Sequence, residues 1–143
     1  MSDPRVENLA KILVNYSSEV KPGDWALVIG SPLAAPLVNA VQKYVLRAGA
    51  NANVLYLTDG TQEILLREGS TAQLEWVSPL EKLLYDKADV MIKINAANNT
   101  RAMSGIDPQK QQIHQAARRE LLKIYMQRAA AGSLRWVGTQ YPC

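Results

Sequence analysis

Trp25-Ala26-Leu27-Val28-Ile29-Gly30 is the stretch that decides the fold, and Ser31-Pro32 follows it directly. The run is apolar without polar alternation, which is typical of a strand buried on both faces of a parallel sheet. Ser31 is a favourable N-cap and Pro32 fits the first helical position, so we expect a helix to begin at once and to end at Gly49. A short turn therefore connects a buried strand to a helix.

The same strand-and-helix unit recurs along the chain. Further strands are predicted at residues 53–57, 89–95 and 134–138, and helical stretches separate them. Strands that alternate with helices imply a parallel sheet with its crossover helices packed on the faces. We therefore predict an α/β fold, a doubly wound, mostly parallel four-stranded sheet with helices on both faces, within a single domain over residues 1–143.

Cap residues mark the ends of the other helices. Asp3-Pro4 opens the first helix, which is expected to end near Ser18. Asp107-Pro108 opens a long helix that should end at Gly132. The apolar face of the first helix is expected to hold Val6, Leu9, Ile12 or Leu13, and Tyr16. The residues of the long helix that should face the sheet are Ile113, Leu121, Ile124 and Met126.

Two shorter helices have capping-box spacing at their starts. Ser70 is followed by Gln73, and Ser78-Pro79-Leu80-Glu81 adds a proline at the first helical position. Between the second strand and these helices, Ile64, Leu65 and Leu66 are expected to form one apolar helix face.

Composition excludes several classes of protein. The chain has 143 residues, 48% hydrophobic residues and a net charge of +3, as an ordinary globular domain does. The basic residues are scattered without interleaved aromatic residues, so we do not expect nucleic-acid binding. No signal core or membrane-spanning run is present, and the lone Cys143 fits a reducing compartment. We expect a cytoplasmic protein that does not bind membranes.

The sequence offers few groups for chemistry. His114 and Cys143 are the chain's single histidine and single cysteine, too few for a zinc site or a nucleophilic triad. No phosphate-binding glycine motif follows a strand. We therefore predict no catalytic, metal-binding or cofactor-binding residue, and we interpret His114 as a partly exposed helix residue. The three tryptophans are expected to pack in the core or at an interface: Trp25, Trp76 and Trp136.

The polar loop at residues 95–105 is the most unusual stretch. It follows the third predicted strand, and ligands of open α/β sheets bind beyond the carboxyl ends of strands. In one interpretation its side chains only satisfy backbone groups of an irregular turn. In the other, Arg101 anchors a carboxylate or an acidic residue of a partner domain, because its guanidinium can pair with both oxygens. Candidate substrate-cavity or interdomain contacts are Asn99, Thr100, Arg101 and Ser104.

Several stretches resemble one family in order along the chain. They are Val14-Asn15-Tyr16-Ser17, Lys21-Pro22-Gly23-Asp24, Ala48-Gly49-Ala50, Trp76-Val77-Ser78-Pro79-Leu80-Glu81, residues 99–108 and residues 134–142. Together they resemble the amino-terminal domain of the thermophilic metalloaminopeptidases of the aminopeptidase T and aminopeptidase S type. The resemblance implies a cytoplasmic, often dimeric exopeptidase that releases amino-terminal residues from peptides with two divalent ions, such as zinc or cobalt.

In that family the metal ligands and the catalytic carboxylate lie in a later domain. The resemblance therefore implies that this chain is the amino-terminal, non-catalytic portion of a longer aminopeptidase, without its catalytic domain. This portion would support a homodimer and help to wall the substrate cavity, with the catalytic domain as its partner. The alternative is a stand-alone α/β binding or interaction module without catalytic activity.

The end of the last predicted strand bears on this choice. The chain stops where a further helix would be expected, so the segment has the appearance of a truncation. In that case an apolar edge around Trp136, Val137 and Tyr141 would be left uncovered, and self-association is expected.

Overall fold

The computed structural model describes residues 3–58, 60–96 and 105–141, and these contain a four-stranded, all-parallel sheet in the order β2-β1-β3-β4. All four predicted strands are confirmed, with ends that differ from the prediction by three residues at most. The strands are β1 (Trp25–Gly30), β2 (Asn51–Tyr56), β3 (Val90–Ala96) and β4 (Arg135–Tyr141).

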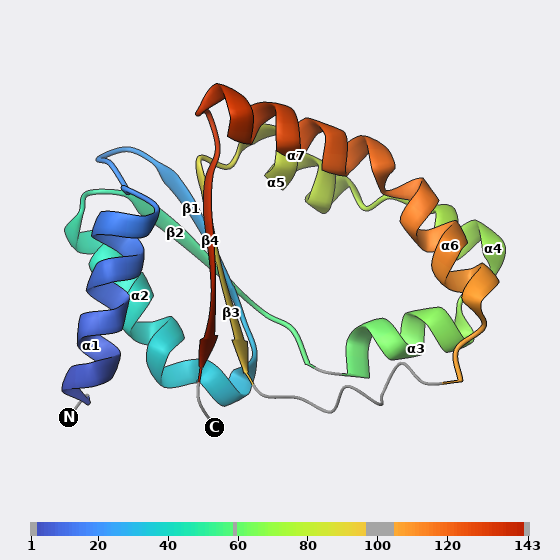
Figure 1. Ribbon diagram of the computed structural model, residues 1–143, viewed down its shortest axis with the longest axis horizontal. Helices are drawn as coiled ribbons and strands as arrows, with labels where there is room; N and C mark the ends of the chain where they lie inside the picture. Colours follow the sequence, from blue (N-terminus) through green and yellow to red (C-terminus); the bar gives the residue numbers. More distant parts are fainter. Residues whose placement is uncertain (1–2, 59, 97–104, 142–143) are drawn as a thin grey trace.

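Helices lie on both faces of this sheet (Figure 1), so the doubly wound α/β prediction is confirmed. In the part of the chain that the structure describes, no helix is long and apolar enough to cross a membrane. The helical elements are α1 (Pro4–Lys11), the π-helical turn η1 (Ile12–Ser17), the 3-10 turn η2 (Pro32–Ala34), α2 (Ala35–Arg47), α3 (Gly60–Glu68), α4 (Thr71–Glu75), α5 (Pro79–Lys87), α6 (Pro108–Ala117) and α7 (Arg119–Ala131).

The main core lies between the sheet and helices α1 and α2, and we call this side of the sheet the covered face. Val28, Ile92 and Ile94 point into it from the two central strands, and at most 1% of each is exposed. Leu37 and Val41 of α2 meet them. Each such aliphatic side chain gains about 1.5–3 kcal/mol by leaving water, so this face contributes most to stability.

The opposite side of the sheet carries a smaller core. Leu27, Met91 and Leu134 pack there with α5 and α7. Tyr85 and Tyr125, from these two helices, meet edge to face with ring centroids 5.8 Å apart. Burial and the neighbouring Tyr85 raise the pKa of Tyr125 to about 12, so its phenol is neutral at physiological pH.

A third group of apolar residues, the outer cluster, lies away from the sheet. It consists of Leu66, Leu74 and Ile106, with Ile113 packed against them. These residues join α3, α4 and α6, which Figure 1 shows at a distance from the strands. Helices α3 and α4 of the β2–β3 connection and α6 of the β3–β4 connection therefore form a small helical cluster away from the sheet.

The predicted single long helix is wrong, because the backbone leaves the helical region at Arg118 and divides it into α6 and α7. Arg118 pairs there with Glu81 of α5. As a result Ile113 packs in the outer cluster instead of against the sheet, and 67% of Met126 is exposed. Leu121 is buried as expected.

The first helix also buries a different set of residues from the predicted one. Tyr16 was expected inside, but 82% of it is exposed, whereas Leu13 and Val14 are buried. The cause is η1: a π-helical turn holds more residues than an α-helical one, so spacing by 3.6 fails beyond residue 11. The Ser18 hydroxyl closes this turn by donating to the Leu13 carbonyl oxygen over 2.6 Å.

Helix α3 buries one residue of the expected three. Leu66 lies in the outer cluster, while Ile64 and Leu65 are exposed. A helix that packs only on two short neighbours, α4 and α6, has little surface against which to bury a wider face.

The cap predictions are mostly confirmed. At five helix starts the cap oxygen accepts a backbone N–H, and Ser70 and Gln73 form the reciprocal capping box. The backbone N–H of Arg5 lowers the pKa of one of these caps, Asp3. The second predicted box fails because Glu81 pairs with Arg118. The caps are Asp3, Ser31, Ser70, Ser78 and Asp107.

The tryptophans do not pack in the core as a group. Trp25 is half-buried, and its Nε1 donates to Asn53 Oδ1 over 2.8 Å. Trp76 and Trp136 are 66% and 55% exposed, although the Trp136 ring contacts the Tyr125 ring. Packing at an interface stays a prediction for these two residues.

Candidate functional site

The strand order places the topological switch point of the sheet at the carboxyl ends of β1 and β3. In doubly wound sheets, ligands bind where neighbouring strands send their connections to opposite faces, just beyond those ends. Here β1 continues into α2 on the covered face, whereas the connections through α5 and α7 lie on the other side. The switch point therefore lies between Gly30 of β1 and residues 94–96 of β3.

The β1 side of the switch point is tightly built. A β-carbon on Gly30 would lie 2.6 Å from Cγ2 of Val38, so α2 can sit this close to the strand only because the residue is glycine. The Ser31 hydroxyl accepts the N–H of Leu33 over 3.2 Å and starts the next helical turn. These residues fix the path of the chain, and Ser31 uses its oxygen as a cap.

The β3 side presents polar groups. Lys93 and Asn95 are exposed, whereas Ile92, Ile94 and Ala96, which alternate with them, are buried. Lys93 lies beside Gly138 of β4 in the strand register. We call Lys93, Asn95 and the neighbouring exposed β4 residues Trp136, Gly138 and Gln140 the open face.

An exposed face on an interior strand is unusual, because parallel sheets are normally covered on both sides. Figure 1 shows the reason: α5 and α7 pack near the amino ends of the strands, and α3, α4 and α6 stand away from the sheet. The carboxyl half of β3 and β4 on this side therefore has no described helix packed on it.

The predicted contact residues Asn99, Thr100, Arg101 and Ser104 lie outside the described residues, so their role stays a prediction. The chain enters this stretch at the sheet edge, after Ala96, and is described again from Gly105. The next residue, Ile106, is buried in the outer cluster, and its carbonyl oxygen accepts the Gln111 amide over 3.4 Å.

The described residues do not fit a metal ion. Within residues 3–58, 60–96 and 105–141, no three His, Cys, Asp or Glu side chains gather as a set of ligands. No catalytic or metal-binding role is therefore assigned to any described residue.

His114 lies half-buried on α6, as expected for a helix histidine. Its pKa is lowered, first by burial and second by the guanidinium of Arg118, while the carboxylate of Glu81 acts in the opposite direction. Arg118 and Glu81 are the pair at the break between α6 and α7. His114 therefore belongs to a structural junction.

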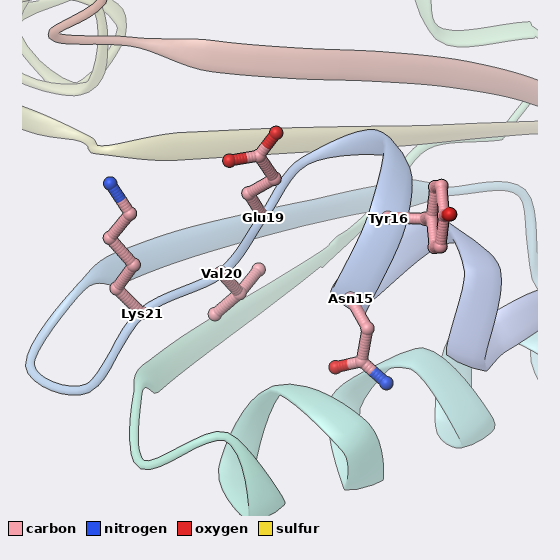
Figure 2. Close-up of a pocket in the computed structure, with 5 residues that line it drawn as sticks. All are labelled: Asn15, Tyr16, Glu19, Val20 and Lys21. Atoms are coloured by element: carbon pink, nitrogen blue, oxygen red, sulfur yellow. The ribbon is translucent and has the colours of Figure 1, made fainter.

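A separate hollow of about 370 Å³ lies where η1 leads toward β1, lined by residues 15–16 and 19–21. In Figure 2 the side chains of Glu19 and Lys21 point to one side, and Asn15 points to the other. The Glu19 backbone has a φ of 46°, and its carbonyl oxygen accepts a hydrogen bond from Arg135. The side chains do not converge, so we assign no site here.

Sequence reasoning missed the open face, although a signal was present. In Met91-Ile92-Lys93-Ile94-Asn95 the polar residues alternate with apolar ones, which indicates a strand with one solvated side. Our prediction for this stretch is only a third strand of a sheet with helices on both faces, which leaves out the solvated side.

Comparison with known proteins agrees with this architecture. No match was found among curated protein sequences. Wild-type AmpT from Thermus thermophilus shares the fold with a TM-score of 0.71 and 15% sequence identity; the match covers 95% of this chain and 35% of AmpT. The chain thus spans about a third of that structure's length. A sequence model of the thermophilic metalloprotease (M29) family matches residues 2–143. The chain therefore belongs to the thermophilic metalloprotease (M29) family.

Proposed function

We propose that the chain is the amino-terminal, non-catalytic portion of a metal-dependent aminopeptidase that releases amino-terminal residues from peptides. The match of the M29 family over residues 2–143 carries this proposal. The chain corresponds to about a third of AmpT, and its described residues provide no metal-ligand set. These observations support a division of labour in which further polypeptide holds the metal.

In this proposal the domain has a supporting role. It forms part of the wall of the substrate cavity, contacts the catalytic domain and supports a homodimer in the cytoplasm. The metal of the complete enzyme is a divalent ion such as zinc or cobalt. The exposed polar groups at the carboxyl edge of the sheet, with the loop of Arg101, are the surface that we assign to these contacts.

Peptide-bond hydrolysis tests the proposal. The 143-residue chain, supplied with Zn²⁺ or Co²⁺, is expected to release no amino acid from an aminoacyl amide, since activating water near neutral pH takes a metal held by several ligands. An M29 chain of AmpT length is the positive control. Turnover that co-purifies with the 143-residue chain and survives His114→Ala would contradict the proposal.

A stand-alone binding module is the second candidate, and the open face is the observation that favours it. An assay that adds the chain to the catalytic portion of an M29 enzyme, prepared without the first third of that enzyme, distinguishes the two candidate functions. Restored or increased hydrolysis supports the aminopeptidase portion, and no association between the two pieces supports the module.

A further inference from the structure

The outer edge of β4 has free backbone groups. Among the described residues, no strand pairs with β4 on the side away from β3. The N–H of Arg135 donates to the carbonyl oxygen of Asp89 over 3.0 Å, so it points toward β3. In a strand, the N–H and C=O of one residue point to one side and those of the next residue point to the other. The N–H and C=O groups of Trp136, Gly138 and Gln140 therefore point away from β3.

This edge lacks the features that usually protect an edge strand. Natural sheets block their edges with proline, lysine, bulges or very short strands. The seven residues Arg135–Tyr141 contain no proline, lysine, aspartate or glutamate, and they stay in register with β3 throughout. The one charged residue, Arg135, is paired with Asp24 on the other side of the sheet. The edge can therefore accept another strand.

The side chains beside the edge leave room for those of a neighbour. Trp136 is 55% exposed on the open face. At Gly138 an added β-carbon would meet nothing closer than the Lys93 carbonyl oxygen at 3.9 Å. A side chain from an added strand can lie over Gly138 and pack against the exposed part of the indole ring.

Lys93 gives this surface its charge preference. It is exposed on the strand next to β4, and no ion pair or other interaction is found for it among the described residues. Its neighbours on the open face, Asn95 and Gln140, are uncharged. A carboxylate on an added strand would pair with the Lys93 ammonium group.

We propose that the free edge of β4 binds an extended acidic peptide segment of another polypeptide as a fifth strand. The segment's backbone pairs with the outward groups of Trp136, Gly138 and Gln140. One of its apolar side chains covers Trp136, and a carboxylate reaches Lys93. A second copy of this chain fits less well, because its β4 carries no carboxylate for Lys93. The occupant thus differs from the self-association expected from the sequence.

Binding of a designed pair of peptides tests the proposal, whether or not the chain takes part in hydrolysis. The probes are acetyl-Thr-Val-Thr-Glu-Thr-Val-Thr-amide, which places its valines and its glutamate on one face of the strand, and the same peptide with lysine in place of glutamate. With ¹⁵N-labelled chain, the acidic peptide should shift the amide signals of Trp136, Gly138 and Gln140. Its Kd at low salt should be about fivefold lower than that of the basic peptide, and rising salt should reduce this preference.

Two matched pairs of variants separate charge from backbone pairing. Lys93→Gln should abolish the preference for the acidic peptide, whereas Lys123→Gln, an exposed lysine on α7, should keep it. Gly138→Pro removes an outward N–H and should abolish binding, whereas Gly138→Ala keeps the N–H and should bind normally. A dispersed amide spectrum of Gly138→Pro shows that the variant is folded. If it is unfolded, the comparison of Lys93→Gln with Lys123→Gln tests the proposal.

Three results would overturn the proposal. The first is equal affinity for both peptides, or no shift at β4. The second is undiminished binding to folded Gly138→Pro. The third is a concentration-dependent dimer that Gly138→Pro dissociates, since a second copy of the chain would then be the strand that pairs with β4.

Discussion

The two sides of strand β3 differ sharply in their exposure to solvent. Ile92 and Ile94 point to the covered face and are almost completely buried under α1 and α2. Lys93 and Asn95 alternate with them and are exposed on the open face. One strand thus belongs to a core on one side and to a solvated surface on the other.

The difference separates two tasks within one sheet. The covered face excludes water from aliphatic side chains, and that burial is the main source of folding free energy. The open face combines a lysine, two amides and an indole, and contributes little to the core. The recognition role proposed for this surface explains why an interior strand of a parallel sheet keeps polar groups, although an apolar face under a helix would be the more stable arrangement.

The largest expected effect comes from Ile92→Ala on the covered face. The substitution leaves a cavity beneath α2 and should lower the free energy of unfolding by about 2 to 5 kcal/mol. Lys93→Ala, one residue further on, should change it by less than about 0.5 kcal/mol. Urea unfolding of the 143-residue chain and both variants measures the two values. Equal losses would mean that the open face is part of the folding core.

A smaller effect is expected from His114, which belongs to neither face of the sheet. Its lowered pKa means that the unfolded chain, with a histidine pKa near 6.5, binds the proton more readily than the folded chain. The stability that this group contributes is complete above pH 6.5 and is lost as the pH falls through the lowered folded value.

Urea midpoints measured from about pH 7 to pH 5 follow this titration. The 143-residue chain should lose more stability over this range than His114→Gln, whose residue 114 does not titrate. The same slope in both proteins would show that burial beside Arg118 does not affect protonation of His114.

The smallest effect on stability is expected from Arg101→Ala. If Arg101 contacts a partner and not its own domain, the variant should unfold within about 0.5 kcal/mol of the unchanged chain. Removing one half of a buried charged pair between domains can cost about 3 to 5 kcal/mol, so activity or dimer formation of a complete M29 enzyme should weaken. A large loss of stability in the isolated domain would instead make Arg101 an internal clamp and end the functional interpretation of its loop.

Local signals predicted the fold well. The strand at Trp25–Gly30 and the caps at Asp3, Ser70 and Asp107 depend on residues a few positions apart. Such short-range patterns can be found in a single sequence. The break at Arg118 could not, since it accompanies an ion pair with Glu81, which is 37 positions away along the chain.

The candidate site was harder to predict. The carboxyl ends of β1 and β3 follow from strand order, but the sequence does not reveal that α3, α4 and α6 stand away from the sheet. Without that fact, a doubly wound sheet predicts that Lys93 and Asn95 are buried, even though their alternation with isoleucine indicates a solvated side. The exposure of Trp136 likewise depends on which helix covers β4.

The contact between Asp89 and Trp25 has a consequence for the route by which the chain folds. The Asp89 carboxylate accepts the N–H of Trp25, which lies 64 positions earlier in the chain, and fixes the start of β3 beside β1. Closing so long a loop costs more entropy than joining β1 to β2 through α2. The β1–α2–β2 unit should therefore form first. Strand β3 then pairs with β1, and β4 pairs with β3 last. Pulsed hydrogen exchange during refolding should protect Val28 before Ile92, and simultaneous protection would argue for one concerted step.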